Sequence, residues 1–262
     1  MAIKSIEIFD YAFDRAEHFL TLYDILHNSR QRKAPQPWKE KFSRLMRWPV
    51  NEQFIRIDGK DKNSMLILRS TLGIDRKYFA EEFTGELLRS SIVASISALD
   101  KYMHSIVIEK CWVLLNGRGT IPTDLANFKV PLITTKKALD KLRSDKKARP
   151  GSQVKLQIQQ MLHRELTFQN AAGMERAARL MGIKDFWRQV AAKMPNSPTA
   201  NETKNDLRKV ARRRNRIVHE ADIVRKISAK SISQNRIDRS EVFEMVNWVR
   251  DFVHAMDDVF NQ

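Results

Sequence analysis

The sequence predicts an all-α protein, a helical bundle with an inserted segment after its first helix. Only eight glycines and eight prolines interrupt 262 residues, and apolar side chains recur every three or four positions along most of the chain. A hydrophobic content of 42% favours a folded core, and the length allows one large domain or two small ones. We therefore expect a mostly helical protein with a sizeable core.

The first half of the chain contains two predicted helices separated by a less regular segment. Residues 5–28 place apolar side chains at mixed three- and four-residue spacing, which is typical of an amphipathic helix. Residues 31–83 have a poorer pattern and are predicted to be an insertion of unknown role, with a short strand and turn at 54–60. A wide apolar stripe over residues 84–115 predicts a central, mostly buried helix. Residues 1–30 and 84–262 are expected to form the helical domain.

The second half is predicted to be a series of helices with recognisable starts. Shorter helices are expected near 134–142, 153–167, 173–181 and 184–194, with a loop at 116–131 and an exposed basic connection at 143–155. Thr199 and Glu202 fit a capping box, so a helix is expected to start near Ala200. Asp238 and Glu241 give a similar start for the last helix.

The chain is strongly basic, with a formal net charge of +16 and a pI near 10.1. A polyanion is the first partner to consider, because clustered Lys and Arg release counterions when they neutralise phosphates. The apolar runs are too short to span a bilayer, and the amino terminus lacks the apolar region of a signal peptide. Cys111 is the only cysteine, which excludes an internal disulfide and a multi-cysteine zinc site. We expect a cytoplasmic protein.

The stretch RRRNRIVHEAD, residues 212–222, is the strongest candidate for a functional site. It puts four arginines, an asparagine and a histidine into eight consecutive positions. Steps of three and four residues along the predicted helix define one stripe of side chains, which consists of Leu207, Val210, Arg214, Ile217, Ala221 and Val224. Arg214 is the one polar member, and a guanidinium on an apolar seam is costly unless it meets an anion or a second chain. Arg214 is therefore a first indication of a site.

A row of polar side chains lies beside this stripe. Asn215 and His219 are four positions apart, and Arg212 and Asp222 extend the row by three positions at either end. The row combines a phosphate-binding Arg, an amide, an imidazole and a carboxylate that could orient the imidazole. Arg214 and His219 are about 140° apart on an ideal helix. Both are expected to serve one site only if the helix is distorted or if two copies of it face each other.

A plainer interpretation of the same stretch stays open on the residues alone. In a chain this rich in arginine, an Arg five positions before one of six histidines is expected about once by chance. A run of arginines is usually a solvated face or a nonspecific nucleic-acid patch.

Residues 214–219, RNRIVH, resemble the signature of the HEPN superfamily, an Arg followed by a polar residue and, after four to six positions, a His. The longer segment RNRIVHEAD, together with the earlier helical segment RSSIVASISALDKYMHSIV, is similar to the branch of the superfamily called RiboL-PSP-HEPN. The resemblance covers about residues 84–260 and the first helix, whereas residues 31–83 do not match it. It implies a helical bundle that forms a homodimer, with motif helices face to face and the active site at the interface.

The resemblance also implies an activity. HEPN proteins of this kind are typically metal-independent endoribonucleases of toxin, anti-phage or other defence systems. RNA is then the substrate, no cofactor or metal is required, and the products end in a 2′,3′-cyclic phosphate and a 5′-hydroxyl. The residue types suit this chemistry, because an imidazole transfers protons near neutral pH and an Arg stabilises charge on a phosphorane. The RNA target, the trigger and any regulatory partner protein stay open.

By this resemblance Arg214 and His219 are the catalytic pair, and Asn215 positions the phosphate or the histidine. Two neighbouring arginines also lie within range of His219, so the register is ambiguous. We prefer Arg214 because Asn215 follows it and because it interrupts the apolar stripe. The arginines expected to contact the RNA backbone are Arg212, Arg213 and Arg216.

Three carboxylates are weaker candidates for support. Asp222 could hold the His219 tautomer and Glu220 flanks the same histidine, although surface carboxylates are the commoner outcome. Asp100, on the long apolar helix, is expected to be a structural hydrogen-bond partner or to line the cleft. Ala221 stands where some HEPN toxins carry a Tyr that a partner nucleotidyltransferase modifies, so silencing by that route is not expected.

Two other functions compete with the nuclease. A noncatalytic RNA-binding or scaffold protein would keep the bundle and its charge without turnover. HEPN proteins of that kind usually have an eroded motif, whereas this motif is intact. Membrane-surface binding through the basic helices has less support, because the amphipathic faces are expected to form the bundle core. We therefore expect no membrane partner.

Overall fold

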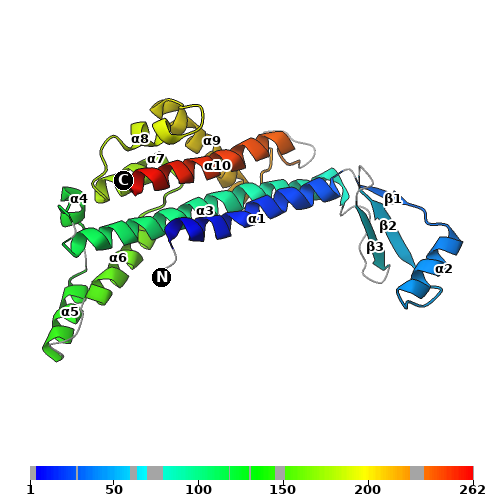
Figure 1. Ribbon diagram of the computed structural model, residues 1–262, viewed down its shortest axis with the longest axis horizontal. Coiled ribbons are helices and arrows are strands. Elements are labelled where there is room, and N and C mark those ends of the chain that lie inside the picture. The colour runs from blue at the N-terminus through cyan, green and yellow to red at the C-terminus, as the bar shows by residue number, and fades with distance from the viewer. Residues whose placement is uncertain are drawn as a thin grey trace.

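A computed structural model shows a protein built mainly from helices, which confirms the predicted fold class (Figure 1). The part of the chain that the structure describes contains ten helices and three short strands. The described residues are 4–27, 29–59, 64–69, 79–117, 119–129, 131–144, 151–224 and 233–261.

Three long helices form the centre of the molecule. α1 (Ser5–Leu26) and α3 (Glu81–Leu115) run antiparallel beside each other, and α10 (Arg239–Phe260) lies along α3 (Figure 1). The predicted central helix is confirmed and begins at Glu81 rather than at residue 84. Among the described helices, none is both long enough and apolar enough to cross a membrane.

A small sheet with one helix stands at the end of the α1–α3 pair (Figure 1). It consists of β1 (Arg30–Arg32), α2 (Gln36–Leu45), β2 (Phe54–Asp58) and β3 (Met65–Arg69), with the strands antiparallel in the order β1-β2-β3. We call this segment the β-unit. The predicted strand at 54–60 is confirmed by β2, whereas α2, β1 and β3 were not predicted. Its core is aromatic and consists of Trp38, Phe42, Trp48 and Phe54.

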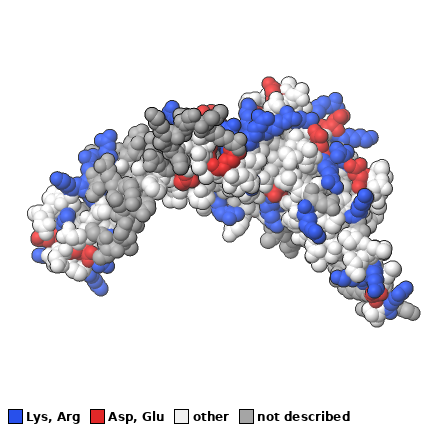
Figure 2. Space-filling model, turned by 180° about the vertical axis from the view of Figure 1, so that it is seen from behind, with Lys and Arg blue, Asp and Glu red and all other residues white. Residues whose placement is uncertain are grey.

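The visible surface carries many basic side chains. Figure 2 shows Lys and Arg along the upper edge of the helical part and again on the β-unit, with fewer Asp and Glu between them. This distribution matches the net charge of +16. On this face, both the helical part and the β-unit therefore carry basic side chains that would attract a polyanion.

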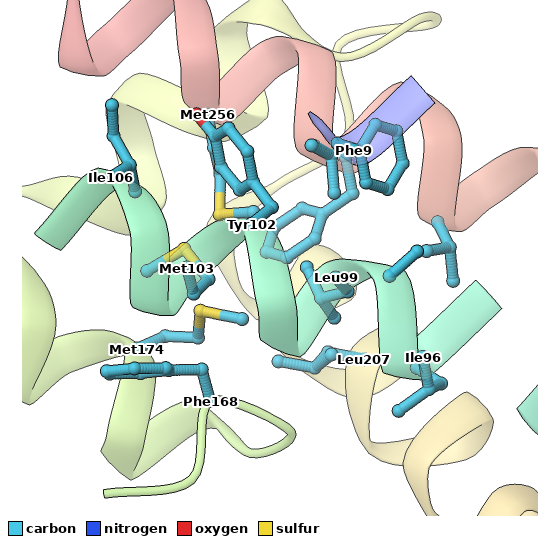
Figure 3. Close-up of a cluster of buried hydrophobic side chains, with 14 of the residues drawn as sticks. Phe9, Ile96, Leu99, Tyr102, Met103, Ile106, Phe168, Met174, Leu207 and Met256 are labelled. Carbon is cyan, nitrogen blue, oxygen red and sulfur yellow. The ribbon is translucent and has the colours of Figure 1, made fainter. Parts of the chain in front are cut away.

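Side chains from several elements converge on α3 in the core. Figure 3 shows Leu99, Tyr102 and Met103 of α3 among Phe9, Phe168, Met174, Leu207 and Met256, all of them buried. The Tyr102 hydroxyl donates a hydrogen bond to Oδ1 of Asp257 at 2.9 Å. Burial raises the pKa of Tyr102 far above its usual value, so the phenol stays a neutral donor that links α3 to α10.

Five shorter helices connect the long ones. They are α4 (Thr123–Ala126), α5 (Leu132–Ser144), α6 (Gly151–Glu165), α7 (Ala171–Leu180) and α8 (Phe186–Lys193). The predictions for α5 to α8 are confirmed, whereas α4 lies inside the predicted loop. Pro122 precedes α4 and has the fixed φ that favours the start of a short helix. In the predicted connection at 143–155, residues 145–150 lie outside the described residues.

The last two long helices start at the predicted capping residues. α9 (Ala200–Glu220) has a capping box, in which the Thr199 amide donates to Oε2 of Glu202 at 2.7 Å and the Glu202 amide donates to Oγ1 of Thr199 at 3.2 Å. Oδ1 of Asp238 accepts from the first amides of α10. These bonds fix where α9 begins, and therefore the register of the motif that it carries.

Candidate active site

The polar face of α9 lines a pocket of about 420 Å³ against the loop that joins α6 to α7. The lining residues from α9 are Arg208, Ala211, Arg212, Arg214, Asn215 and His219, and those from the loop are Thr167, Gln169 and Asn170. Leu207 and Val210, on the stripe that also carries Arg214, are buried in the core and hold the helix in place. The structure therefore brings Arg214, Asn215 and His219 together in one pocket.

Arg214 is half-buried in this pocket, and its hydrogen bonds are incomplete. Its Nη1 donates to Oδ1 of Asn215 at 3.1 Å. Its Nε is buried, and no residue that the structure describes accepts a hydrogen bond from it. Leaving a buried donor unsatisfied costs about 1–3 kcal/mol. An anionic ligand in the pocket would supply the missing acceptor and form a charge-assisted hydrogen bond.

Arg214 and His219 line the same pocket within one copy of the chain. The sequence-based expectation that this needs a distorted helix or a second copy was too strict. α9 is a single helix from Ala200 to Glu220, and both side chains still reach the pocket. An Arg side chain is long enough to bridge a large angular separation, because its stem lies along the helix surface while its head group points elsewhere.

The opposite face of α9 is tied to the bundle by a buried ion-pair cluster. Arg213 lies about 200° around the helix from Asn215. Its Nη1 donates to Oδ1 of Asp222 at 2.6 Å, and Nε of Arg89 on α3 donates to Oδ2 of Asp222 at 2.8 Å. The Asp222 side chain is fully buried, and those of Arg89 and Arg213 are only 5% and 14% exposed. Each buried charge is therefore compensated by a partner.

This cluster also fixes the end of α9. Ala221 and Asp222 have φ values of 49° and 54°, which residues other than glycine rarely adopt. The Asp222 amide donates to the Arg216 carbonyl at 3.0 Å, and the Asn235 amide donates to the Asp222 carbonyl at 2.7 Å. These bonds hold a strained turn directly after the end of α9 at Glu220.

The cluster gives two of the candidate residues different roles from those expected. The sequence suggests that Asp222 orients His219, but the Asp222 carboxylate is bonded to Arg89 and Arg213 instead. Arg213 is expected to contact RNA, yet it pairs with Asp222 and does not line the pocket. Both residues therefore position α9.

The remaining candidates divide between the pocket and its surroundings. Arg212 lines the pocket and is exposed, as a backbone-contacting arginine would be. Arg216 is exposed but is not part of the pocket lining. Glu220 is half-buried and also lies outside the lining.

Comparison with known families identifies the family of this chain. A model of the RiboL-PSP-HEPN family matches residues 66–262. The chain belongs to this family. The match begins within β3 and includes the complete pocket and the Asp222 cluster. No curated protein and no solved structure matches the chain significantly.

In this HEPN chain, Asp100 supports the loop that forms the second wall of the pocket. Its Oδ1 accepts a hydrogen bond from the Phe168 amide at 2.8 Å. Phe168 is fully buried, so the loop is anchored at its centre by one polar and one apolar contact. Asp100 itself is absent from the pocket lining. Of the two roles expected for it, the structure places it as a structural hydrogen-bond partner.

Two histidines, which the sequence does not connect, meet behind this loop. The rings of His104 on α3 and His163 on α6 are stacked with centroids 4.1 Å apart. Oδ2 of Asp100 lies 3.8 Å from Nε2 of His104. Burial lowers the pKa of His104, with Asp100 opposing the shift. His104 is therefore held in its neutral form near neutral pH.

Four polar residues of the pocket lining were not among the sequence-based candidates. Arg208 is four positions before Arg212, so helical periodicity extends the polar row to it and could have identified it. Thr167, Gln169 and Asn170 lie far from α9 in the sequence, in a short loop without a catalytic motif. The packing of α7 and Phe168 against α3 (Figure 3), together with the hydrogen bond from the Phe168 amide to Asp100, brings that loop to the pocket.

Proposed function

We propose that this HEPN protein is a metal-independent endoribonuclease that leaves 2′,3′-cyclic phosphate and 5′-hydroxyl ends. The observation that carries the proposal is the shared pocket of Arg214, Asn215 and His219, in which Nε of Arg214 is buried without an acceptor among the described residues. A scissile phosphate bound there would supply that acceptor. Arg208 and Arg212 in the same lining add positive charge for the flanking backbone.

The proposed reaction is an intramolecular transesterification. The imidazole of His219 removes the proton of the ribose 2′-hydroxyl, and the 2′-oxygen attacks phosphorus. The bond from phosphorus to the 5′-oxygen breaks, and that oxygen takes up a proton as it leaves. Arg214 stabilises the negative charge that develops on the phosphorane, and Asn215 holds the Arg214 guanidinium through the 3.1 Å hydrogen bond.

A homodimer would complete this site. The reaction needs a base and an acid, whereas the pocket of one copy is lined by a single histidine, His219. Two α9 helices face to face would bring a second His219 to protonate the leaving oxygen. His219 and Arg212 are exposed in the single chain, so both are accessible to a second copy.

We also propose a biological context and a domain division. Family membership supports a toxin or anti-phage defence effector in the cytoplasm, restrained by a regulatory partner protein. Residues 31–83 would be an insertion into a helical domain formed by 1–30 and 84–262. Buried Phe54 and Ile57 of the β-unit support this division, because neither belongs to the hydrophobic cluster of the bundle.

The decisive experiment incubates the purified protein with total RNA in EDTA and maps the product ends. We expect His219→Ala to lower the cleavage rate by about 10²–10⁴-fold, because general acid–base catalysis contributes that much. RNA affinity should stay nearly unchanged in this variant. Arg214→Ala should lower the rate as well. His18→Ala and Arg15→Ala, at exposed positions of α1, are the matched controls and should keep wild-type activity.

Two outcomes would contradict the proposal. Full cleavage by His219→Ala would remove His219 from the mechanism. Salt-sensitive RNA binding without product at any protein concentration would favour a noncatalytic RNA-binding protein instead.

A further inference from the structure

The pocket has two chemically different walls. The α9 wall carries the cations and the imidazole, which suit a phosphate and its neighbouring hydroxyl. The wall formed by the α6–α7 loop carries only uncharged hydrogen-bonding side chains, those of Thr167, Gln169 and Asn170. A second phosphate would find no cation on the loop wall. The loop wall is therefore suited to a neutral polar group next to the bound phosphate.

The loop wall has a fixed backbone. The Phe168 amide donates to Asp100, and the Phe168 ring is fully buried. Oδ1 of Asn170 accepts from the Gly173 amide at 2.8 Å and caps α7. A Cβ at Gly173 would overlap the carbonyl oxygen of Thr167, so only glycine allows the loop to fold back onto α7 this closely. The side chains that face the pocket therefore project from a preorganised frame.

Gln169 is the best placed of these side chains for recognition. It is half-buried in the pocket, and no residue that the structure describes forms a hydrogen bond with its amide group. Asn170 uses its oxygen in the cap of α7, so its amide NH₂ is left to face a ligand. Gln169 thus offers a donor and an acceptor side by side.

We infer that the loop wall reads the base of the nucleotide whose phosphate lies against α9, with Gln169 as the main specificity-determining residue. The inference rests on the proposed function for the position of the phosphate. A planar amide pairs bidentately with a base edge, as Gln and Asn do with adenine. Sequence-specific recognition of RNA acts mainly on unpaired bases, whose edges are free for such bonds. The ligand class is therefore a nucleotide in single-stranded RNA.

The size of the pocket is consistent with one nucleotide. Ligand sites usually enclose about 300–1,000 Å³. The pocket of about 420 Å³ is at the small end of that range, enough for a base, a ribose and a phosphate but not for a duplex. Double-stranded RNA should therefore bind outside the pocket and resist cleavage.

The first test compares cleavage profiles on a single-stranded RNA pool of random sequence. The full-length wild type, Gln169→Leu and Gln160→Leu are incubated with the pool, and the cut sites are sequenced. Gln160 is an exposed glutamine on α6 and serves as the matched control. We expect wild type and control to prefer one base beside the cut by about tenfold or more, the discrimination typical of a bidentate pair. Gln169→Leu should lose this preference while it still cleaves.

The outcomes separate the inference from the proposed function. If Gln169→Leu keeps the wild-type base preference, or if the wild type has none, the inference is wrong. The proposed nuclease activity is not contradicted by either result. If the wild type cuts no RNA, the proposed nuclease fails, and a binding experiment decides the inference alone. Wild type and Gln169→Leu are then titrated with the four nucleoside 3′-monophosphates. A preference among bases that Gln169→Leu abolishes supports the inference, and equal or absent binding of all four overturns it.

Discussion

Three consecutive arginines of α9 have three different environments. Arg212 is exposed at the pocket, and Arg213 is paired with buried Asp222. Nε of Arg214 is buried without a partner in the described part of the chain. Successive residues turn by about 100° on a helix, so the register of α9 decides which arginine meets which surroundings. Their chemical identity is the same, but only Arg212 and Arg214 are available to a ligand in the pocket.

The Asp222 cluster is expected to be a main source of stability for α9. In Asp222→Ala, Arg89 and Arg213 would keep their charges with little solvent to compensate them. Removing one partner of a buried ion pair costs about 3–5 kcal/mol. We expect the free energy of unfolding, measured in urea, to fall by that amount. In Asp206→Ala, on the same helix, only the ion pair with the exposed Lys209 is lost, and the cost should stay below about 1 kcal/mol.

A double variant separates charge from packing in this cluster. If the unpaired charges cause the loss, the double variant Arg89→Met/Asp222→Leu should recover part of it, because apolar residues of similar size replace buried ion pairs well. An equal loss in Asp222→Ala and Asp206→Ala would show that the cluster contributes no more than a surface pair.

The sequence allows the environment of Arg214 to be predicted but not that of Arg213. Arg214 interrupts an apolar stripe, and such a stripe is a local pattern that any helix of that register must bury. The pair between Arg89 and Asp222 joins residues that are 133 positions apart. No local pattern encodes a contact over that separation. The sequence alone therefore suggests the nearby His219 as the partner of Asp222.

At the scale of elements, the α6–α7 loop depends on one glycine. Gly173 lies in the first turn of α7, where alanine would normally be favoured by about 1 kcal/mol. A Cβ at this position would overlap the Thr167 carbonyl, which is part of the backbone and has to move. At this position, helix propensity therefore favours alanine, whereas the local packing favours glycine.

We expect the packing to dominate in Gly173→Ala. The loop should shift, and RNA cleavage should fall by about tenfold or more, since a displacement near 1 Å in a catalytic site has effects of that size or larger. Ala172→Ser, an exposed neighbour on the same turn, is the control. Unchanged cleavage together with a raised melting temperature would mean that helix propensity decides and that the loop adapts.

At the scale of the whole molecule, the sequence predicts the helical part well and the β-unit poorly. Long helices such as α3 and α10 repeat their apolar pattern over many turns, so local periodicity defines them. β1 has three residues, and β2 and β3 have five each. Strands this short carry little periodicity, and their pairing depends on contacts that local patterns do not contain.

The β-unit has a core of its own. Trp38, Phe42, Trp48 and Phe54 pack on one another, and Arg56 lies 5.4 Å above the Trp38 ring. The hydrophobic cluster of the bundle includes none of these four aromatic residues. A unit of about forty residues has on the order of 2–6 kcal/mol of stability at 0.05–0.15 kcal/mol per residue. Its folding should therefore be separable from that of the bundle.

Phe54→Ala tests this separation. Truncating a buried Phe costs about 3–5 kcal/mol, which is comparable with the whole stability expected for the β-unit. We expect amide hydrogen exchange to become fast over residues 30–69, while α1, α3 and α9 keep their wild-type protection and RNA cleavage continues. Phe243→Ala, at a position of α10 that is 43% exposed, is the control and should leave exchange in the β-unit unchanged. If α3 and α9 lose protection together with the β-unit, the chain is one cooperative unit, and the proposed division at residues 31–83 is wrong.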